Sequence, residues 1–126
     1  DFLYKNADIV SLHLPFNLET IDLFNKEIIQ KFNKPFWLIN TSRGKIVNTS
    51  DLVDALNEKK ILGAGLDVID IESSSFKNIE KELNPYFKQL LNLKNVIITP
   101  HIAGWTFESN VKLSQIIIDK IESYIK

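Results

Sequence analysis

The sequence contains no cysteine, which excludes disulfide bonds and thiolate-bound metal sites. It also lacks any apolar run approaching the roughly 18 residues of a membrane-spanning helix. Acidic and basic residues are mixed along the chain and leave a net charge of −1, so the basic patch of a nucleic-acid-binding surface is missing. We therefore expect no nucleic-acid, membrane or metal partner. The lack of cysteine is compatible with a reducing cytoplasm, which is the location we expect.

The composition is sufficient for one modest domain with a core. The chain has 126 residues, of which 44% are hydrophobic, so global disorder is not expected. Apolar runs bounded by turn residues predict four strands, at 7–14, 36–40, 63–68 and 95–99. Helical spacing predicts helices at 26–32, capped by Asn25, at 51–59, capped by Ser50 or Thr49, and at 107–126, whereas 69–92 is expected to be a long loop with some helix.

Alternating strands and helices predict an α/β fold with a parallel sheet, in which the strands are buried on both faces. Ligands of such sheets bind at the carboxyl ends of the strands. The predicted strand ends carry Leu14-Pro15, Thr41-Ser42-Arg43, the segment from Asp67 to Glu72, and His101. Because four strand ends agree, we expect the functional site along this one edge of the sheet.

His101 is the candidate with the clearest chemistry. It follows the last predicted strand and precedes a turn of small residues, Ala103-Gly104, which leaves space for a flat ligand. Histidine is the usual proton donor and acceptor near neutral pH. The alternative is a structural histidine that caps the last helix, and the residue by itself does not decide between these two interpretations.

Arg43 and Glu72 are the charged candidates at the other strand ends. Arg43 stands between Ser42 and Gly44, where its guanidinium could hold a carboxylate through two hydrogen bonds; a solvated surface charge is the alternative. Glu72 could hold His101 in position and favour its imidazolium form, because a nearby negative charge raises a histidine pKa. A surface acid beside Asp70 is the alternative for Glu72.

Three further residues have two interpretations each. Asp67 follows a strand of small residues and could accept a hydrogen bond from a ligand amide, or it could order its own loop. His13 lies within an apolar run and is interpreted as core or ligand-adjacent packing. Trp105 is interpreted as a packing residue or as the wall of a pocket.

Five segments form a combined signature that none of them carries alone. They are Ala7-Asp8-Ile9-Val10-Ser11-Leu12-His13-Leu14-Pro15, Leu38-Ile39-Asn40-Thr41-Ser42-Arg43-Gly44, Leu52-Val53-Asp54-Ala55-Leu56, Gly63-Ala64-Gly65-Leu66-Asp67-Val68 and Asn95-Val96-Ile97-Ile98-Thr99-Pro100-His101-Ile102-Ala103-Gly104. In this order they resemble the nicotinamide-dependent D-isomer-specific 2-hydroxyacid dehydrogenases, a family that includes D-3-phosphoglycerate dehydrogenase. The ordered set is highly specific.

The resemblance implies three catalytic residues. Arg43 matches the arginine that binds the substrate carboxylate and polarises the reacting carbonyl. His101 matches the acid/base that exchanges a proton with the substrate oxygen, and Glu72 matches the carboxylate paired with it. The implied reaction is hydride transfer between NAD(H) and C2 of a 2-hydroxy or 2-keto acid, in which the cofactor supplies the hydride chemistry.

The resemblance also implies contacts with the cofactor. Asp67 and the Thr41-Ser42 region match contacts to the nicotinamide carboxamide. Leu14-Pro15 matches the loop against the ribose, and Ala103-Gly104 the turn beside the nicotinamide. NADP is not excluded, because the acid that discriminates the two cofactors has no counterpart in this sequence.

Two features depart from the family pattern. Ser73 stands where the family usually has proline after the catalytic glutamate, and the segment 73–92 is longer than in many relatives. No G-x-G-x-x-G motif occurs, although that loop normally holds the pyrophosphate at a helix N-terminus. We therefore expect residues 1–126 to be the C-terminal half of a Rossmann-type doubly wound domain, without the glycine-rich loop and the substrate domain.

Two hypotheses remain at this point. The chain is the catalytic half of an enzyme, or it is a non-catalytic half-domain that acts in assembly. A half-sheet exposes an edge strand that invites pairing with another chain, so we expect a homodimer or association through that edge. A glycine-rich loop encoded before Asp1 would favour the enzyme.

Overall fold

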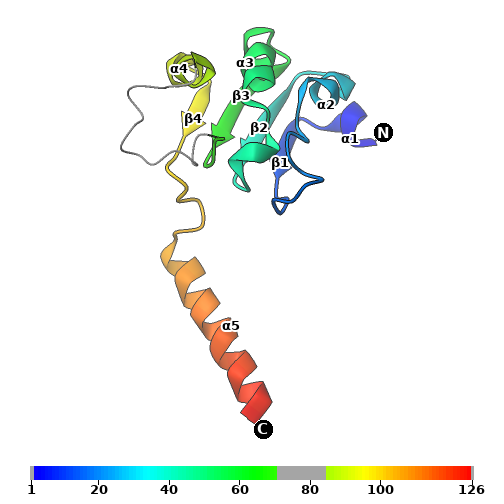
Figure 1. Ribbon diagram of the computed structural model, residues 1–126. Helices are drawn as coiled ribbons and strands as arrows, with labels where there is room; N and C mark the ends of the chain where they lie inside the picture. Colours follow the sequence, from blue (N-terminus) through cyan, green and yellow to red (C-terminus); the bar gives the residue numbers. More distant parts are fainter. Residues whose placement is uncertain (1, 71–84, 126) are drawn as a thin grey trace.

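The computed structural model describes residues 2–70 and 85–125 (Figure 1). Within them, helices and strands alternate along most of the chain. The elements are α1 (Phe2–Asn6), β1 (Ile9–Leu12), α2 (Lys26–Lys31), β2 (Phe36–Asn40), the 3₁₀ turn η1 (Gly44–Ile46), α3 (Thr49–Asn57), β3 (Ile61–Leu66), α4 (Pro85–Asn92), β4 (Val96–Ile98) and α5 (Phe107–Ile125).

The four strands form one parallel sheet in the order β1-β2-β3-β4. Its register aligns Val10 with Leu38, Leu38 with Ala64, and Ala64 with Val96. The four strand ends therefore lie along one edge, where the sequence places the functional residues. The expected α/β architecture, with parallel strands and a long final helix, is confirmed.

Several element boundaries differ from the expected ones. The strand β1 ends at Leu12, and β3 runs from Ile61 to Leu66, earlier than expected. Asn25 caps α2 as predicted, and its side chain accepts a hydrogen bond from the Ile28 N–H. The predicted cap of α3 by Ser50 or Thr49 is wrong, because Asn48 accepts the Asp51 N–H and both predicted caps lie inside the helix.

The helices α2, α3 and α4 cover one face of the sheet (Figure 1). Alternate strand residues face these helices and are buried, among them Val10, Leu38 and Leu66. Aromatic rings extend the core next to α2: the ring centroids of Phe32 and Phe36 lie 4.1 Å apart, with their planes tilted by 31°. This layer of helix on sheet holds the strand ends in fixed relative positions.

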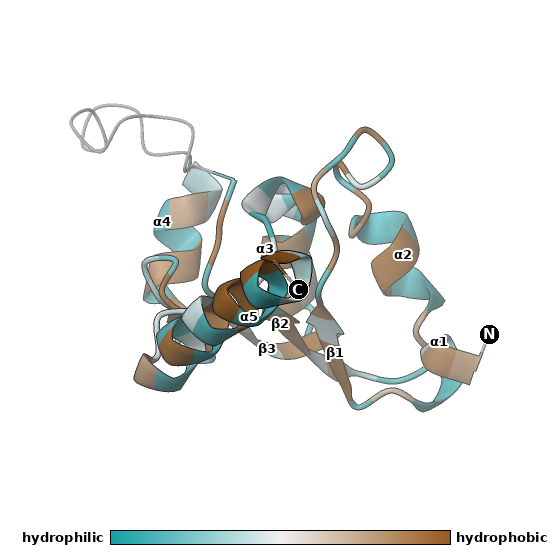
Figure 2. Cartoon of the chain, turned by 90° about the horizontal axis from the view of Figure 1, so that it is seen from below, coloured by the Kyte–Doolittle hydropathy of each residue, from teal (hydrophilic) through white to brown (hydrophobic). Residues whose placement is uncertain are grey.

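The expectation that the strands are buried on both faces is wrong. On the second face Ile9, Trp37, Ile39 and Ile97 keep 60%, 48%, 38% and 70% of their surface exposed. No described helix covers them, because α5 projects away from the sheet (Figures 1 and 2). The helix expected near the C-terminus is confirmed as α5, and none of its residues is buried.

Candidate functional site

Backbone hydrogen bonds continue past the strand ends and join three of the following loops. The Asp67 N–H donates to the Asn40 carbonyl at 3.0 Å, and the Thr99 N–H donates to the Leu66 carbonyl at 3.0 Å. The His101 N–H donates in turn to the Asp67 carbonyl at 2.9 Å. The turns that carry Arg43, Asp67 and His101 are therefore parts of one connected edge.

The turn after β2 is organised by a buried amide. Asn40 is the last residue of β2 and is 0% exposed. Its Oδ1 accepts hydrogen bonds from the Ser42 N–H at 3.1 Å and from the Ser42 hydroxyl at 2.7 Å. Its Nδ2 donates to the Arg43 carbonyl at 3.1 Å. The backbone that presents Arg43 is thus held from inside the protein.

Arg43 is the only arginine in the sequence, and its side chain is exposed. Its Nη1 donates to the Ser42 carbonyl at 2.7 Å, so the guanidinium rests against its own turn. The remaining N–H groups of the fork suit a carboxylate. The exposed guanidinium is compatible both with a carboxylate-binding group and with a solvated surface charge.

Gly44 brings the turn after β2 into direct contact with the loop after β3. A Cβ atom on Gly44 would lie 2.2 Å from the carbonyl carbon of Ile69 and 2.5 Å from the Asp70 nitrogen. A residue without a side chain is therefore required here, since larger residues would force the two backbones apart. The close approach brings Arg43 beside the segment that leads toward residue 71.

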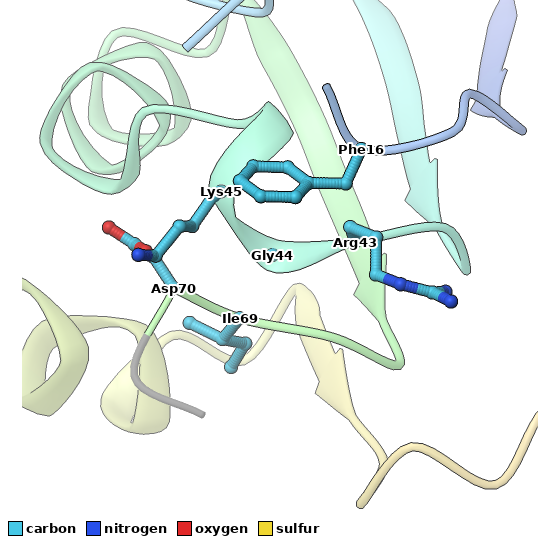
Figure 3. A pocket seen from close by; sticks show the side chains of 6 residues that line it. All are labelled: Phe16, Arg43, Gly44, Lys45, Ile69 and Asp70. Atoms are coloured by element: carbon cyan, nitrogen blue, oxygen red, sulfur yellow. The ribbon is translucent and has the colours of Figure 1, made fainter. Parts of the chain in front are cut away.

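A cavity of about 150 Å³ opens at this contact, lined by Phe16, Arg43, Gly44, Lys45, Ile69 and Asp70 (Figure 3). The Arg43 guanidinium points away from Lys45 and Asp70. Partial desolvation of the Asp70 carboxyl raises its pKa; the charge of Lys45 lessens this effect and that of Asp22 reinforces it. The cavity therefore combines an aromatic wall with charges of both signs.

The loop after β4 is held by the carboxylate of Asp67, which is 4% exposed. Its Oδ1 accepts hydrogen bonds from the Thr99 hydroxyl at 2.5 Å and from the Ile102 N–H at 2.9 Å. Its Oδ2 accepts one from the Ala103 N–H at 2.9 Å. Asp67 therefore orders the loop on both sides of His101, which is one of the two interpretations that the sequence left open.

The ionised form of Asp67 is stabilised by these contacts. Burial by itself would raise the pKa of the carboxyl. The hydrogen bonds from Thr99, Ala103 and Ile102 and the charge of His101 outweigh that effect and hold the pKa below its usual value of 3.8. Asp67 therefore keeps a negative charge beside the loop that carries His101.

His101 lies exposed in the loop between β4 and α5, with a backbone φ of 56°. This left-handed conformation is uncommon for a residue with a side chain and is associated with functional sites. The interpretation of His101 as the cap of α5 is wrong, because the Thr106 hydroxyl oxygen accepts the Ser109 N–H at the start of that helix. The strained loop is instead held by Asp67.

The other predicted residues are placed as follows. Leu14, Pro15, Ala103 and Gly104 are exposed at the same edge, whereas Thr41 is partly buried. Glu72 lies outside the described residues. The core interpretation of His13 is wrong, because its exposed ring shares a hydrogen bond of 2.8 Å with the Ser11 hydroxyl, beyond the end of β1. Trp105 is 80% exposed, so its packing interpretation is also wrong.

Sequence reasoning missed three residues of this edge. Asn40 reads as the polar end of an apolar strand, and Lys45 as an ordinary surface charge. Phe16 follows Pro15 in a loop, where an aromatic residue has no periodic signal. Only the contact between the loops after β2 and β3 shows that Lys45 and Phe16 line one cavity with Arg43.

Two searches of the described ranges gave negative results. Residues 2–70 and 85–125 contain no group of three or more histidine, aspartate or glutamate side chains arranged to hold a metal ion. Within the same ranges every helix is too short or too polar to cross a lipid bilayer.

Comparison with known families gives a specific match. The family model described as D-isomer specific 2-hydroxyacid dehydrogenase, NAD binding domain, matches residues 1–103. The chain is 40% identical over 126 residues to a hydroxypyruvate reductase of Blautia hydrogenotrophica, with 100% of the chain and 36% of that protein covered. The chain thus spans little more than a third of this relative's length.

Solved structures agree with the sequence match. A D-isomer specific 2-hydroxyacid dehydrogenase from Lactobacillus delbrueckii ssp. bulgaricus, in its NAD-complexed form, superposes with a TM-score of 0.76 at 37% identity, covering 90% of this chain and 36% of that one. A D-lactate dehydrogenase from Sporolactobacillus sp. gives a TM-score of 0.78 at 35% identity, covering 98% and 38%.

Proposed function

This chain belongs to the NAD-binding domain family of the D-isomer-specific 2-hydroxyacid dehydrogenases, and we propose that it supplies the nicotinamide side and the catalytic groups of such an enzyme. The main support for this proposal is the set of hydrogen bonds that the Asp67 carboxylate accepts from the loop of His101. This loop lies at the same edge of the sheet as the Arg43 turn. On that edge Arg43 follows β2 and His101 follows β4, and Asp67 follows β3, the strand between them. Because the chain covers about a third of its relatives, the activity of the whole protein is part of this proposal.

Each catalytic residue has a defined task in the proposed reaction. Arg43 binds the substrate carboxylate through its guanidinium fork and polarises the carbonyl at C2. His101 donates a proton to the carbonyl oxygen during reduction and removes it during oxidation. Glu72 is proposed to pair with His101 and favour its protonated form.

The residues at the strand ends fit the nicotinamide half of the cofactor. When bound, NADH supplies the hydride. Asp67 retains acceptor capacity on Oδ2, which has one donor, and we propose that this oxygen and Thr41-Ser42 orient the carboxamide. The exposed Leu14-Pro15 and Ala103-Gly104 provide the surfaces against the ribose and the nicotinamide ring. No Cβ contact lies within 4 Å at Gly104, so the backbone there leaves room for a flat group.

The pyrophosphate half of the cofactor is not accounted for by these residues. A G-x-G-x-x-G loop is missing from the sequence, and such a loop normally provides backbone N–H groups for phosphates. We propose that this chain is the C-terminal half of the dinucleotide-binding domain and that polypeptide outside residues 1–126 binds the pyrophosphate. The choice between NAD and NADP depends on that same polypeptide.

The proposed substrate is a small D-2-hydroxy acid or its 2-keto acid. The relatives described above are named for hydroxypyruvate and D-lactate, and another is named a glyoxylate reductase. These names favour a short side chain at C2. A phosphoglycerate-type substrate, the finer expectation from the sequence, is the alternative. The cytoplasmic location expected from the sequence stays a prediction.

The test is a substrate panel on the intact protein with NADH and NADPH. Pyruvate, glyoxylate, hydroxypyruvate and 3-phosphohydroxypyruvate are compared through the oxidation of the reduced cofactor at 340 nm. We expect turnover with at least one keto acid, and Arg43→Gln should raise KM for it and lower kcat. Lys31→Gln, which removes a cation of α2, is the matched control. Absence of turnover with every acid would refute the proposed activity.

A second candidate function is assembly, favoured by the apolar sheet face that no described helix covers and by the position of β1 at the edge of the sheet. An unpaired edge strand is a template for association. The proposed partner is a second copy of the chain. Light scattering coupled to size-exclusion chromatography tests this, since a Trp37→Lys variant should dissociate any dimer formed through the open face while leaving the fold intact.

A further inference from the structure

Among the described residues, few polar side chains are buried: Thr20, Asn40, Ser42 and Asp67. Asn40 is the most completely enclosed of them, at 0% exposure. It occupies a sheet position whose partner on β1 is Leu12 and whose partner on β3 is Leu66. A leucine would suit these neighbours, because a buried amide lowers stability unless its hydrogen bonds are satisfied. The amide at this position therefore needs an explanation.

All three hydrogen bonds of the Asn40 side chain go to the turn that carries Arg43. Oδ1 accepts the Ser42 N–H and the Ser42 hydroxyl, at 3.1 and 2.7 Å, and Nδ2 donates to the Arg43 carbonyl at 3.1 Å. The amide thus bridges both sides of the Ser42–Arg43 peptide. The bridge begins at a fixed backbone position, because Asn40 is the last residue of a paired strand.

We propose that Asn40 is a positioning residue for Arg43, because its buried amide fixes the turn from which the guanidinium reaches the substrate carboxylate. The inference rests on the proposed function of Arg43. Its physical basis is preorganisation: a misplacement of about 1 Å in a binding group can reduce turnover by about a hundredfold. The Arg43 side chain is exposed and its Nη1 donates to the Ser42 carbonyl of the same turn, so the position of the guanidinium depends on the backbone beneath it.

Asn40 also connects the Arg43 turn with the neighbouring strand end. Its own carbonyl accepts the Asp67 N–H at 3.0 Å, and Asp67 in turn holds the loop of His101. One residue is therefore bonded through its side chain to the Arg43 turn and through its backbone to the Asp67 turn. Its substitution should disturb the carboxylate site through the side chain while leaving the backbone bond in place.

The first test uses Asn40→Leu, which keeps a similar volume without hydrogen-bonding groups, and Asn40→Asp, which keeps the oxygen that accepts from Ser42. Asn95→Asp is the matched control, because its Nδ2 also donates to a backbone carbonyl, that of Leu62, at 2.8 Å. For Asn40→Leu we expect KM for the keto acid to rise and kcat to fall, each by about tenfold or more. KM for NADH should stay within about twofold.

The pH profile of Asn40→Asp separates positioning from a general loss of stability. The ionised aspartate cannot donate to the Arg43 carbonyl, whereas the protonated acid can. The ratio of its KM for the keto acid to that of the native protein should therefore fall as the pH is lowered. A ratio that does not change with pH would contradict the proposed donation.

A second measurement, which does not depend on enzymatic activity, tests whether Asn40 holds the turn that carries Arg43. Amide hydrogen exchange of this chain should show the Ser42 N–H protected in the native protein and about tenfold or more faster in Asn40→Leu, with Asn95→Asp unchanged. Unchanged Ser42 exchange would overturn the inference. Faster exchange with unaltered KM and kcat would also overturn it. A native protein that reduces no keto acid would refute the proposed function, and Ser42 exchange would still decide whether Asn40 holds the turn.

Discussion

The Asp67 carboxylate accepts a hydrogen bond of 2.9 Å from the N–H of Ala103, in the loop that carries His101. A second oxygen of the same group accepts the Thr99 hydroxyl, so the carboxylate holds the loop on both sides of the histidine. If an NH₂ group replaced the oxygen that accepts from Ala103, it would face the Ala103 N–H, and two donors cannot form a hydrogen bond with each other.

Asp67→Asn should lower the free energy of unfolding by about 1–3 kcal/mol, because a buried N–H group loses its acceptor. Urea unfolding followed by circular dichroism measures this loss. Asp51→Asn is the control, since Asp51 also accepts a backbone N–H, that of Lys26, at 2.8 Å, but in a less buried position. Equal losses in both variants would contradict a special role for the Asp67 contact.

The stabilising effect of Asp67 should depend on pH in one direction. Its pKa in the folded protein lies below the usual 3.8, so the carboxylate contributes stability that is fully present above the unfolded-state pKa. That contribution is lost as the pH falls through the lower, folded-state pKa. The difference in unfolding free energy between the native protein and Asp67→Asn should thus be constant above about pH 5 and shrink in more acidic solution.

Gly44→Ala should destabilise the protein by about 1–3 kcal/mol, because overpacking forces backbone shifts. Its new Cβ would lie 2.2 Å from the Ile69 carbonyl carbon, whereas a Cβ on Gly65 would have no atom within 4 Å. Gly65→Ala is therefore the matched control and should leave stability unchanged or raise it slightly. Chemical unfolding monitored by tryptophan fluorescence compares the two variants, and a Gly44→Ala variant as stable as Gly65→Ala would refute the close contact.

The isolated chain should bind NADH weakly, with Kd above about 1 mM, because residues 1–126 lack a G-x-G-x-x-G loop for the pyrophosphate. Titration calorimetry measures this affinity. Nicotinamide mononucleotide, which has no adenosine half, should bind about equally weakly. Micromolar affinity for NADH would show that the chain contains a pyrophosphate site that its sequence does not reveal.

His101→Ala should reduce kcat by about a hundredfold or more in the intact protein, as expected for loss of a general acid/base. His13 is the only other histidine and makes a hydrogen bond with Ser11, so His13→Ala is the natural comparison and should have a much smaller effect. Turnover assays at saturating NADH and keto acid provide the comparison. Similar losses in the two variants would refute the assignment of His101.

Prediction from the sequence succeeded where the signal lies within one segment. The strand β2 is predicted from Phe36 to Asn40 and is found there, since a β-rich apolar run occupies these residues. Asn25 was predicted as a cap from its position before a helical pattern and is one. The cap of α3 was missed because several capping residues adjoin, and only the backbone geometry selects Asn48.

The candidate site was predicted in part. The sequence placed Arg43, Asp67 and His101 at strand ends, and the parallel sheet aligns them. It left two roles open for Asp67 and for His101. The contacts with Thr99 and Ala103 show that Asp67 orders the loop, and Thr106 takes the capping role once considered for His101.

The sequence by itself determined the alternation of strands and helices, the residues that stand at the strand ends, and the family. These properties depend on neighbours along the chain, because turn residues and apolar periodicity act locally. Only the tertiary structure decided that Asn40 is enclosed, that Gly44 contacts Ile69, and that no helix of residues 2–70 and 85–125 covers one face of the sheet. Those properties depend on register and layer packing between segments far apart in the chain, which no local pattern encodes.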